Sequence, residues 1–91
     1  MCLDFWLYHP DKHPEGLILE CKYQEKGGSC DTKLYFAVQG LRHTGKRSIL
    51  MVMGQGFSPA SVQYCLDEQD EQLLVLRSWD EFVRLFATGH L

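Results

Sequence analysis

The sequence predicts an α/β fold: a mixed four-stranded sheet flanked by helices, in the order β-β-α-β-α-β-α. Two segments that alternate in polarity come first, joined by a short stretch with two prolines and a glycine, which favours an antiparallel pair of strands. The later apolar segments are separated by stretches with helical periodicity, and strands joined through helices favour right-handed parallel connections. The chain has 91 residues, 45% of them hydrophobic and 23% charged, as one globular domain has. We therefore expect a single domain over residues 1–91.

The first half contains two predicted strands and one helix. Residues 3–8 (LDFWLY) alternate between two sets of side chains, and residues 17–23 (LILECKY) alternate in the same way. The stretch HPDKHPEG between them is typical of a turn or loop. From Asp31 the period changes to that of a helix, with apolar residues spaced i, i+3, i+4, i+7: Leu34, Ala37, Val38 and Leu41.

The next predicted strand covers residues 48–53 (SILMVM), which are apolar on both faces, as a strand covered on both sides would be. Ser58 and Pro59 then suit the N-cap and first position of a short helix that runs to about Leu66. A fourth strand follows at residues 73–77 (LLVLR).

A last helix is predicted near the end of the sequence. Ser78 and Glu81 have the spacing of a capping box, and Gly89 is a typical helix stop. The large apolar residues of this helix share one face: Trp79, Phe82, Val83 and Phe86. We expect Trp79, like Tyr64 of the preceding helix, to lie in the core.

The charge is unevenly distributed along the chain. Nine basic and twelve acidic residues give a net charge of −3, which argues against a general nucleic-acid coat protein. Residues 1–47 hold seven basic and six acidic residues (+1), whereas residues 48–91 hold two basic and six acidic (−4). An anion-binding site is therefore expected in the first half.

No segment suggests a membrane or secretory protein. The longest apolar run, residues 49–53, is far shorter than the roughly 20 residues that a membrane span needs, and no signal-like N-terminus is visible. The four cysteines form no CxxC pair, so we expect reduced thiols in a cytoplasmic protein. A zinc site is the alternative, but the spacing of its four candidate ligands matches no common zinc pattern: Cys2, His9, His13 and Cys21.

The residues most informative about chemistry are Glu20 and Lys22. At i and i+2 of a strand they point the same way, about 6.5–7 Å apart, in a segment that is otherwise apolar. A suitable register would bring Asp4 of the preceding strand beside Glu20. Two carboxylates at close range repel one another unless a cation lies between them, and Mg²⁺ takes such oxygen ligands. This pattern predicts metal-assisted phosphodiester hydrolysis, and the alternative is a simple ion pair on an edge strand.

Asp4, followed after a loop by Glu20-Cys21-Lys22 and then by a helix, resembles the PD-(D/E)XK nuclease superfamily, which has the restriction-endonuclease-like fold. The string GLILECKYQEKGGSCDTKL is similar to a branch with E-x-K-x-Q, a glycine-serine turn, an acidic residue and Lys-Leu. The resemblance covers residues 3–56. Family members usually have a helix and a strand before the Asp strand, and this sequence begins three residues before Asp4. We therefore expect one of three cases: a minimal member of the family, the tail of a longer protein, or a chain to which a second subunit supplies the missing part.

The resemblance implies roles for five residues. Asp4 and Glu20 would ligate Mg²⁺, for which Mn²⁺ can substitute, together with the backbone carbonyl of Cys21. Lys22 would position the attacking water and stabilise the charge that develops on the phosphoryl group. Gln24 would orient the site from one step further along the strand.

Weaker expectations concern the substrate's phosphates. Lys33, near the start of the following helix, is a candidate phosphate contact. The basic residues Arg42, Lys46 and Arg47 gather near the next loop, where they would bind a phosphate backbone or simply form a solvated loop.

The resulting expectation is a Mg²⁺-dependent DNA nuclease, with an endonuclease favoured. We expect such a nuclease to form a homodimer or higher homo-oligomer, because cutting both strands of a DNA duplex requires two sites. The alternative is a catalytically incomplete module of the same fold that binds nucleic acid or protein.

Overall fold

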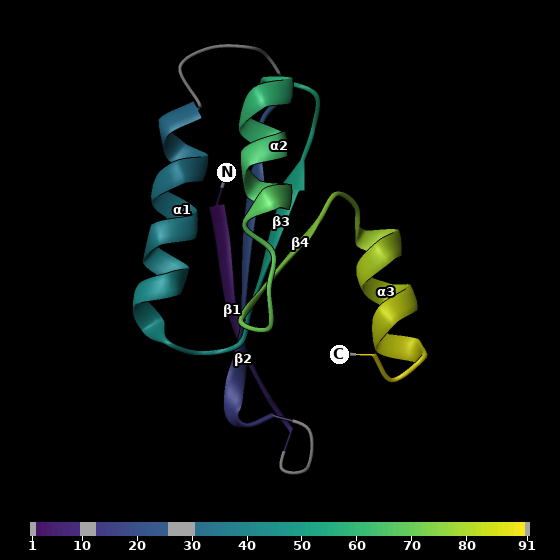
Figure 1. Cartoon of the computed structure of the whole chain (residues 1–91). Helices are drawn as coiled ribbons and strands as arrows, with labels where there is room; N and C mark the ends of the chain where they lie inside the picture. The colour runs from purple at the N-terminus through teal and green to yellow at the C-terminus, as the bar shows by residue number, and fades with distance from the viewer. Residues whose placement is uncertain (1, 10–12, 26–30, 91) are drawn as a thin grey trace.

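The computed structural model describes residues 2–9, 13–25 and 31–90, with side chains over residues 16–25 and 32–90. Its four strands lie in one sheet in the order β1-β2-β3-β4 (Figure 1). They are β1 (Cys2–His9), β2 (His13–Tyr23), β3 (Ser48–Met53) and β4 (Leu73–Leu76). β2, β3 and β4 run parallel, and β1 pairs with β2 antiparallel. The parallel strands and their helical connections confirm the predicted α/β class.

Three helices connect and follow the parallel strands: α1 (Asp31–Thr44), α2 (Pro59–Asp67) and α3 (Trp79–Ala87). The side chains of Ser58 and Ser78 accept hydrogen bonds from the third helical residue of α2 and α3, so both predicted N-caps are confirmed. Among the described residues, no helix has the length and apolarity required to cross a bilayer.

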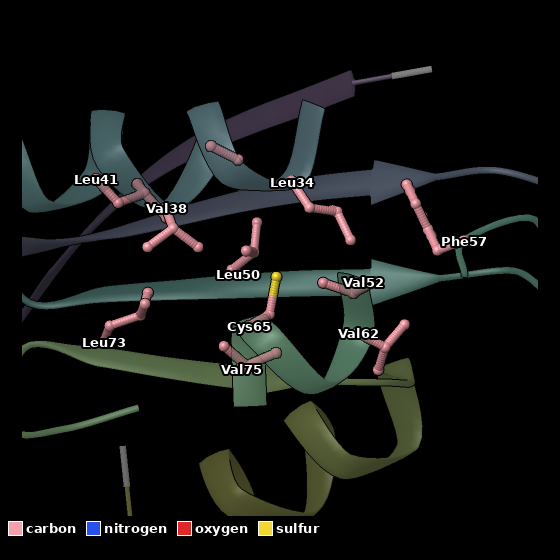
Figure 2. Close-up of a cluster of buried hydrophobic side chains, with 11 residues drawn as sticks. Leu34, Val38, Leu41, Leu50, Val52, Phe57, Val62, Cys65, Leu73 and Val75 are labelled. Carbon is pink, nitrogen blue, oxygen red and sulfur yellow. The ribbon is translucent and has the colours of Figure 1, made fainter. Parts of the chain in front are cut away.

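The two faces of the sheet are covered differently. α1 and α2 lie side by side on one face, where their apolar side chains meet those of β3 and β4 (Figures 1 and 2). This larger core contains the predicted stripe of α1 and the inward residues of the strands: Leu34, Ala37, Val38, Leu41, Leu50, Val52, Leu73 and Val75. The other face has a smaller core, against which α3 packs only Phe82 and Leu85. β3 is buried on both faces, as predicted.

The first hairpin differs from the sequence-based expectation. The connection between the strands is shorter than the predicted loop, because β1 continues to His9 and β2 begins at His13. Residues 10–12 lie outside the described part. Before Ile18, β2 pairs only with β1, and a strand with one open edge tolerates a proline such as Pro14. Gly16 adopts a positive φ of 95°, which a residue with a side chain would resist.

The expectation that Trp79 lies in the core is wrong. Its side chain is 42% exposed, and Val83 and Phe86 are 59% and 63% exposed. Tyr64 of α2 is half-buried against the larger core. The apolar period of α3 predicted the helix correctly, but a period alone says nothing about how much of an apolar face the rest of the chain will cover.

Candidate functional site

Glu20 and Lys22 lie on the face of the sheet that α1 and α2 cover. In the parallel register Glu20 is opposite Leu50 and Lys22 is opposite Val52, and both of these β3 residues belong to the larger core. Alternation along β2 sends the intervening side chain, that of Cys21, to the other face, where it is 3% exposed. The strand therefore presents two charged side chains on one largely apolar face.

The two charged groups form a partly buried ion pair. Lys22 Nζ lies 3.9 Å from Glu20 Oε2, and the side chains are 24% and 18% exposed respectively. Less than 1 Å² of Glu20 Oε2 is accessible to solvent. Attraction between opposite charges is stronger in such a screened position than at a fully hydrated surface, and each charge offsets part of the other's desolvation cost.

The backbone of β1 brings position 4 to this pair. Asp4 is directly opposite Glu20 in the antiparallel register. Residues opposite one another in an antiparallel pair belong to the same face of the sheet, with Cβ atoms about 4.5–5.5 Å apart. The register therefore assigns position 4 to the face of Glu20 and Lys22, while the side chain of Asp4 lies outside the described part of the structure.

The donor types at this site suit a hard divalent cation. Carboxylate and carbonyl oxygens are the ligands that Mg²⁺ prefers, and the predicted set comprises Asp4, Glu20 and the backbone carbonyl of Cys21. Among the described residues, no group of three His, Cys, Asp or Glu side chains gathers closely enough to hold a metal ion. The metal-binding role of Asp4 and Glu20 therefore stays a prediction.

Gln24 lies just beyond the end of β2, where the backbone is attached to the loop that follows β3. Its amide donates to the carbonyl of Met53 at 3.2 Å, and its carbonyl accepts from the amide of Gly56 at 2.7 Å. A Cβ built at Gly54 would overlap the carbonyl of Gln24, and Gly54 has a φ of +89°. The Gly54-Gln55-Gly56 segment, which sequence analysis did not assign to the site, therefore fixes the end of the strand that carries Lys22. A glycine pair directly after a buried strand was its only signal.

Lys33 lies in the first turn of α1, at the end of the parallel strands where β2 finishes (Figure 1). Its side chain is exposed. This is also the end at which Lys22 lies, and the role of Lys33 as a phosphate contact stays a prediction.

The other predicted phosphate contacts lie at the opposite end of the parallel strands. Arg47 directly precedes β3, and its carbonyl accepts from the amide of Ile18, four residues before Lys22. Its guanidinium donates to the carbonyl of Glu71. Lys46 precedes it in the same loop, and its side chain is half-buried. The structure therefore does not bring this cluster to Glu20 and Lys22.

Arg42 is held within the fold. Its guanidinium pairs with Asp70 at 2.8 Å and donates to the carbonyl of Glu68 and, at 3.3 Å, to Gln72. The hydrogen bond from Arg42, followed by that from the amide of Leu73, lowers the pKa of Asp70 to about 2. Arg42 thus ties the end of α1 to the segment between α2 and β4, and binding of phosphate by this cluster stays a prediction.

Comparison with known proteins gives one family match. A family model described as a PD-(D/E)XK nuclease superfamily domain matches residues 1–86 of the 91-residue chain. Neither the curated proteins nor the solved structures gave a match. The matched range includes β1 and the whole segment from Glu20 to Gln24. The chain belongs to the PD-(D/E)XK nuclease superfamily.

Proposed function

We propose that this protein is a Mg²⁺-dependent nuclease that hydrolyses phosphodiester bonds in DNA, most simply as an endonuclease. Membership in the superfamily indicates a nuclease-type function. The observation that supports this chain's own activity is the ion pair of Glu20 and Lys22, with position 4 opposite Glu20 in the backbone register. These are the three positions that metal-assisted hydrolysis requires on neighbouring strands.

In this proposal Asp4, Glu20 and the backbone carbonyl of Cys21 hold the divalent ion, with Mn²⁺ as a substitute for Mg²⁺. When bound, the ion polarises a phosphate oxygen and a water and offsets the charge of the carboxylates. The site lies in the half of the chain that has a net charge of +1, which moderates the overall charge of −3.

Lys22 positions the attacking water or stabilises the charge that develops on the phosphoryl oxygen. An ammonium group has three hydrogen-bond donors, which suits contact with a carboxylate and with a water or phosphoryl oxygen at the same time. Glu20, 3.9 Å away, holds the ammonium in place on the screened face of the sheet. Gln24 orients the strand end, and Lys33 contacts a flanking phosphate.

The test is cleavage of DNA by the full chain with Mg²⁺, with Mn²⁺ and with EDTA. A supercoiled circular plasmid and a single-stranded circle have no ends, so their cleavage identifies an endonuclease. Glu20→Gln and Lys22→Met should each lower the rate at least about 100-fold, because each removes a group that acts on the transition state. Glu71→Gln, a carboxylate at the far end of the parallel strands, is the matched control and should keep the rate.

Cleavage that survives both substitutions at the site would eliminate the proposal. Binding of DNA without cleavage under any metal condition would instead favour the alternative, a catalytically incomplete module of this fold. The charge of −4 over residues 48–91 is the observation that favours that alternative, because a strongly acidic half makes poor contact with a phosphate backbone.

We also propose that the protein acts as a homodimer. Cleavage of both strands of a duplex calls for two sites, and a two-fold assembly matches the symmetry of the duplex backbone.

A further inference from the structure

α3 carries an apolar stripe that its own chain leaves uncovered. Trp79, Val83 and Phe86 follow one another at i, i+4 and i+7, and they are 42%, 59% and 63% exposed. Phe82 and Leu85, the neighbouring apolar residues of the helix, face the smaller core. No residue of α3 is fully buried. The stripe therefore lies beside the side on which the helix packs, and the rings of Trp79 and Phe86 contact that of Phe82.

Charged residues lie beside this stripe, acidic near the start of α3 and basic near its end. If two such helices packed antiparallel, opposite charges would face each other. Asp80 and Glu81 are in the first turn of α3, and Arg84 is in its last turn. Asp80 and Arg84 are four residues apart, so they lie along one flank of the stripe. Within the described part of the chain, neither belongs to an ion pair with another residue. Their charges are thus available to a molecule that covers the stripe.

We propose that a second copy of this chain covers the stripe, with the two α3 helices packed antiparallel about a two-fold axis that passes between residues 82 and 83. In this register Trp79 packs against Phe86 of the partner subunit, and the reverse contact is identical by symmetry. The same register sets Asp80 close to Arg84 of the partner subunit, and both side chains lie on the same flank of the helix pair. The midpoint of the apolar stripe and the midpoint of this charged pair lie within about one residue of each other, so a single register satisfies both.

The main alternative to this helix pair is a dimer in which a second copy adds a strand beside β4, the edge strand nearest α3. Hydrogen bonds within the chain already block this edge. On the outer side of β4, the amide of Leu73 donates to Asp70 Oδ1 at 3.0 Å, and the amide of Val75 donates to Gln69 Oε1 at 2.9 Å. The carbonyl of Leu73 accepts from the amide of Asp70 at 2.9 Å. These groups are the ones that a new strand would need. The helix face is the surface that this region offers to a partner.

The first test measures the molar mass of the full chain across a wide range of concentrations by sedimentation or light scattering. The wild-type protein should be dimeric at the upper end of the range. Phe86→Glu should weaken the dimer at least about tenfold, because it places charge on the stripe at a side chain that is 63% exposed. Phe36→Glu is the matched control: Phe36 is a 68% exposed aromatic residue on α1, and its loss should leave the dimer unchanged.

The second test exchanges the charges. Arg84→Glu leaves only acidic residues on this flank of α3, and Asp80→Lys leaves only basic residues on it. Each should be monomeric alone, and an equimolar mixture should recover the dimer mass, because only the mixed pair is complementary. A wild-type chain that stays monomeric, a Phe86→Glu variant that dimerises normally, or a mixture that stays monomeric would each overturn the proposal. The readout is mass, so this result is independent of nuclease activity.

Discussion

Asp70 is a single carboxylate that joins three parts of the fold. Its Oδ1 accepts hydrogen bonds from Arg42 at the end of α1 and from the amides of Gln72 and Leu73 at the start of β4. These bonds, that from Arg42 first, lower the pKa of Asp70 from 3.8 to about 2 in the folded protein. A carboxylate with a lowered folded pKa contributes stability that is complete above its unfolded pKa and is lost as the pH falls through the folded one. The contribution of Asp70 therefore disappears between about pH 4 and pH 2.

Replacing Asp70 with asparagine should flatten the acid side of the stability profile. An asparagine side chain has no charge to titrate, so the free energy of unfolding of Asp70→Asn should fall less steeply below pH 4 than that of the wild-type protein. Urea unfolding at several pH values measures this slope. Asp67→Asn is the matched control, because Asp67 bonds only to Gln63 on its own helix in the described structure. Equal slopes for the wild-type protein and Asp70→Asn would contradict the role of the Arg42 pair.

Cys65 is a residue whose chemistry is suppressed by burial. It lies on α2 with no exposed surface, inside the larger core that α1 and α2 form with the sheet (Figure 2). Burial raises the pKa of its thiol from 9.0 to about 11. In the folded protein, both the low thiolate fraction and the lack of access should slow alkylation of Cys65 at least about 100-fold relative to the unfolded chain. Peptide mapping by mass spectrometry after timed alkylation, with and without urea, measures this ratio, and equal rates would contradict it.

Cys65 is a free thiol in the described part of the chain. The reduced state of all four cysteines, expected from their spacing, stays a prediction. Cys30 and the side chain of Cys2 lie outside the described part, and so do the side chains of His9 and His13. The zinc alternative therefore stays untested.

At the scale of elements, the turn after β3 is the most exacting piece of local structure. Gly54 combines a φ of +89° with close approach to the backbone carbonyl of Gln24. Gly54→Ala should destabilise the protein by about 2–4 kcal/mol, because it adds backbone strain and forces two main chains apart. Gly40→Ala, on the open surface of α1, should change stability by no more than about 1 kcal/mol, in the stabilising direction. Urea unfolding of both variants measures the difference, and similar effects at the two sites would contradict this account.

The elements themselves were predictable because most of their signals are local. Ser58-Pro59 and Ser78 identify two helix starts by their capping chemistry, and the apolar run at 48–53 identifies the central strand to the residue. The hairpin was less predictable, since pairing across the sheet decides whether residues 13–16 are extended. The exposure of α3 was not predictable either, because a periodic apolar face does not indicate what will cover it.

At the scale of the whole molecule, the candidate site was predictable in part. The two-residue period of a strand places Glu20 and Lys22 on one face, and the structure gives them a common ion pair. Asp4 lies opposite Glu20 only in one register of β1 and β2, and sequence patterns do not determine that register. Proximity in sequence was a poor guide to the basic residues, because a helix carries the chain from one end of the sheet to the other. Lys33 and Arg47 thus lie at opposite ends of α1.

Burial across the molecule predicts the order in which its elements open. β3 is covered on both faces, and five of its six residues are buried, whereas α3 has no buried residue. Local stability follows burial and contact density, so backbone amides of β3 should exchange with deuterium most slowly and those of α3 among the fastest. Exchange measured by mass spectrometry on short peptides resolves the two elements. Faster exchange in β3 than in α3 would contradict the packing described above.

The same measurement connects the packing of α3 to the proposed dimer. A helix that is covered only by a second copy should gain protection as the protein concentration rises, because the dimer fraction follows mass action. We therefore expect exchange in α3 to slow with increasing concentration, while exchange in β3 stays constant. In Phe86→Glu, whose dimer is weakened, exchange in α3 should be fast across the same range of concentrations. Protection of α3 that is independent of concentration in the wild-type protein would show that its own chain already stabilises this helix, and the need for a partner would disappear.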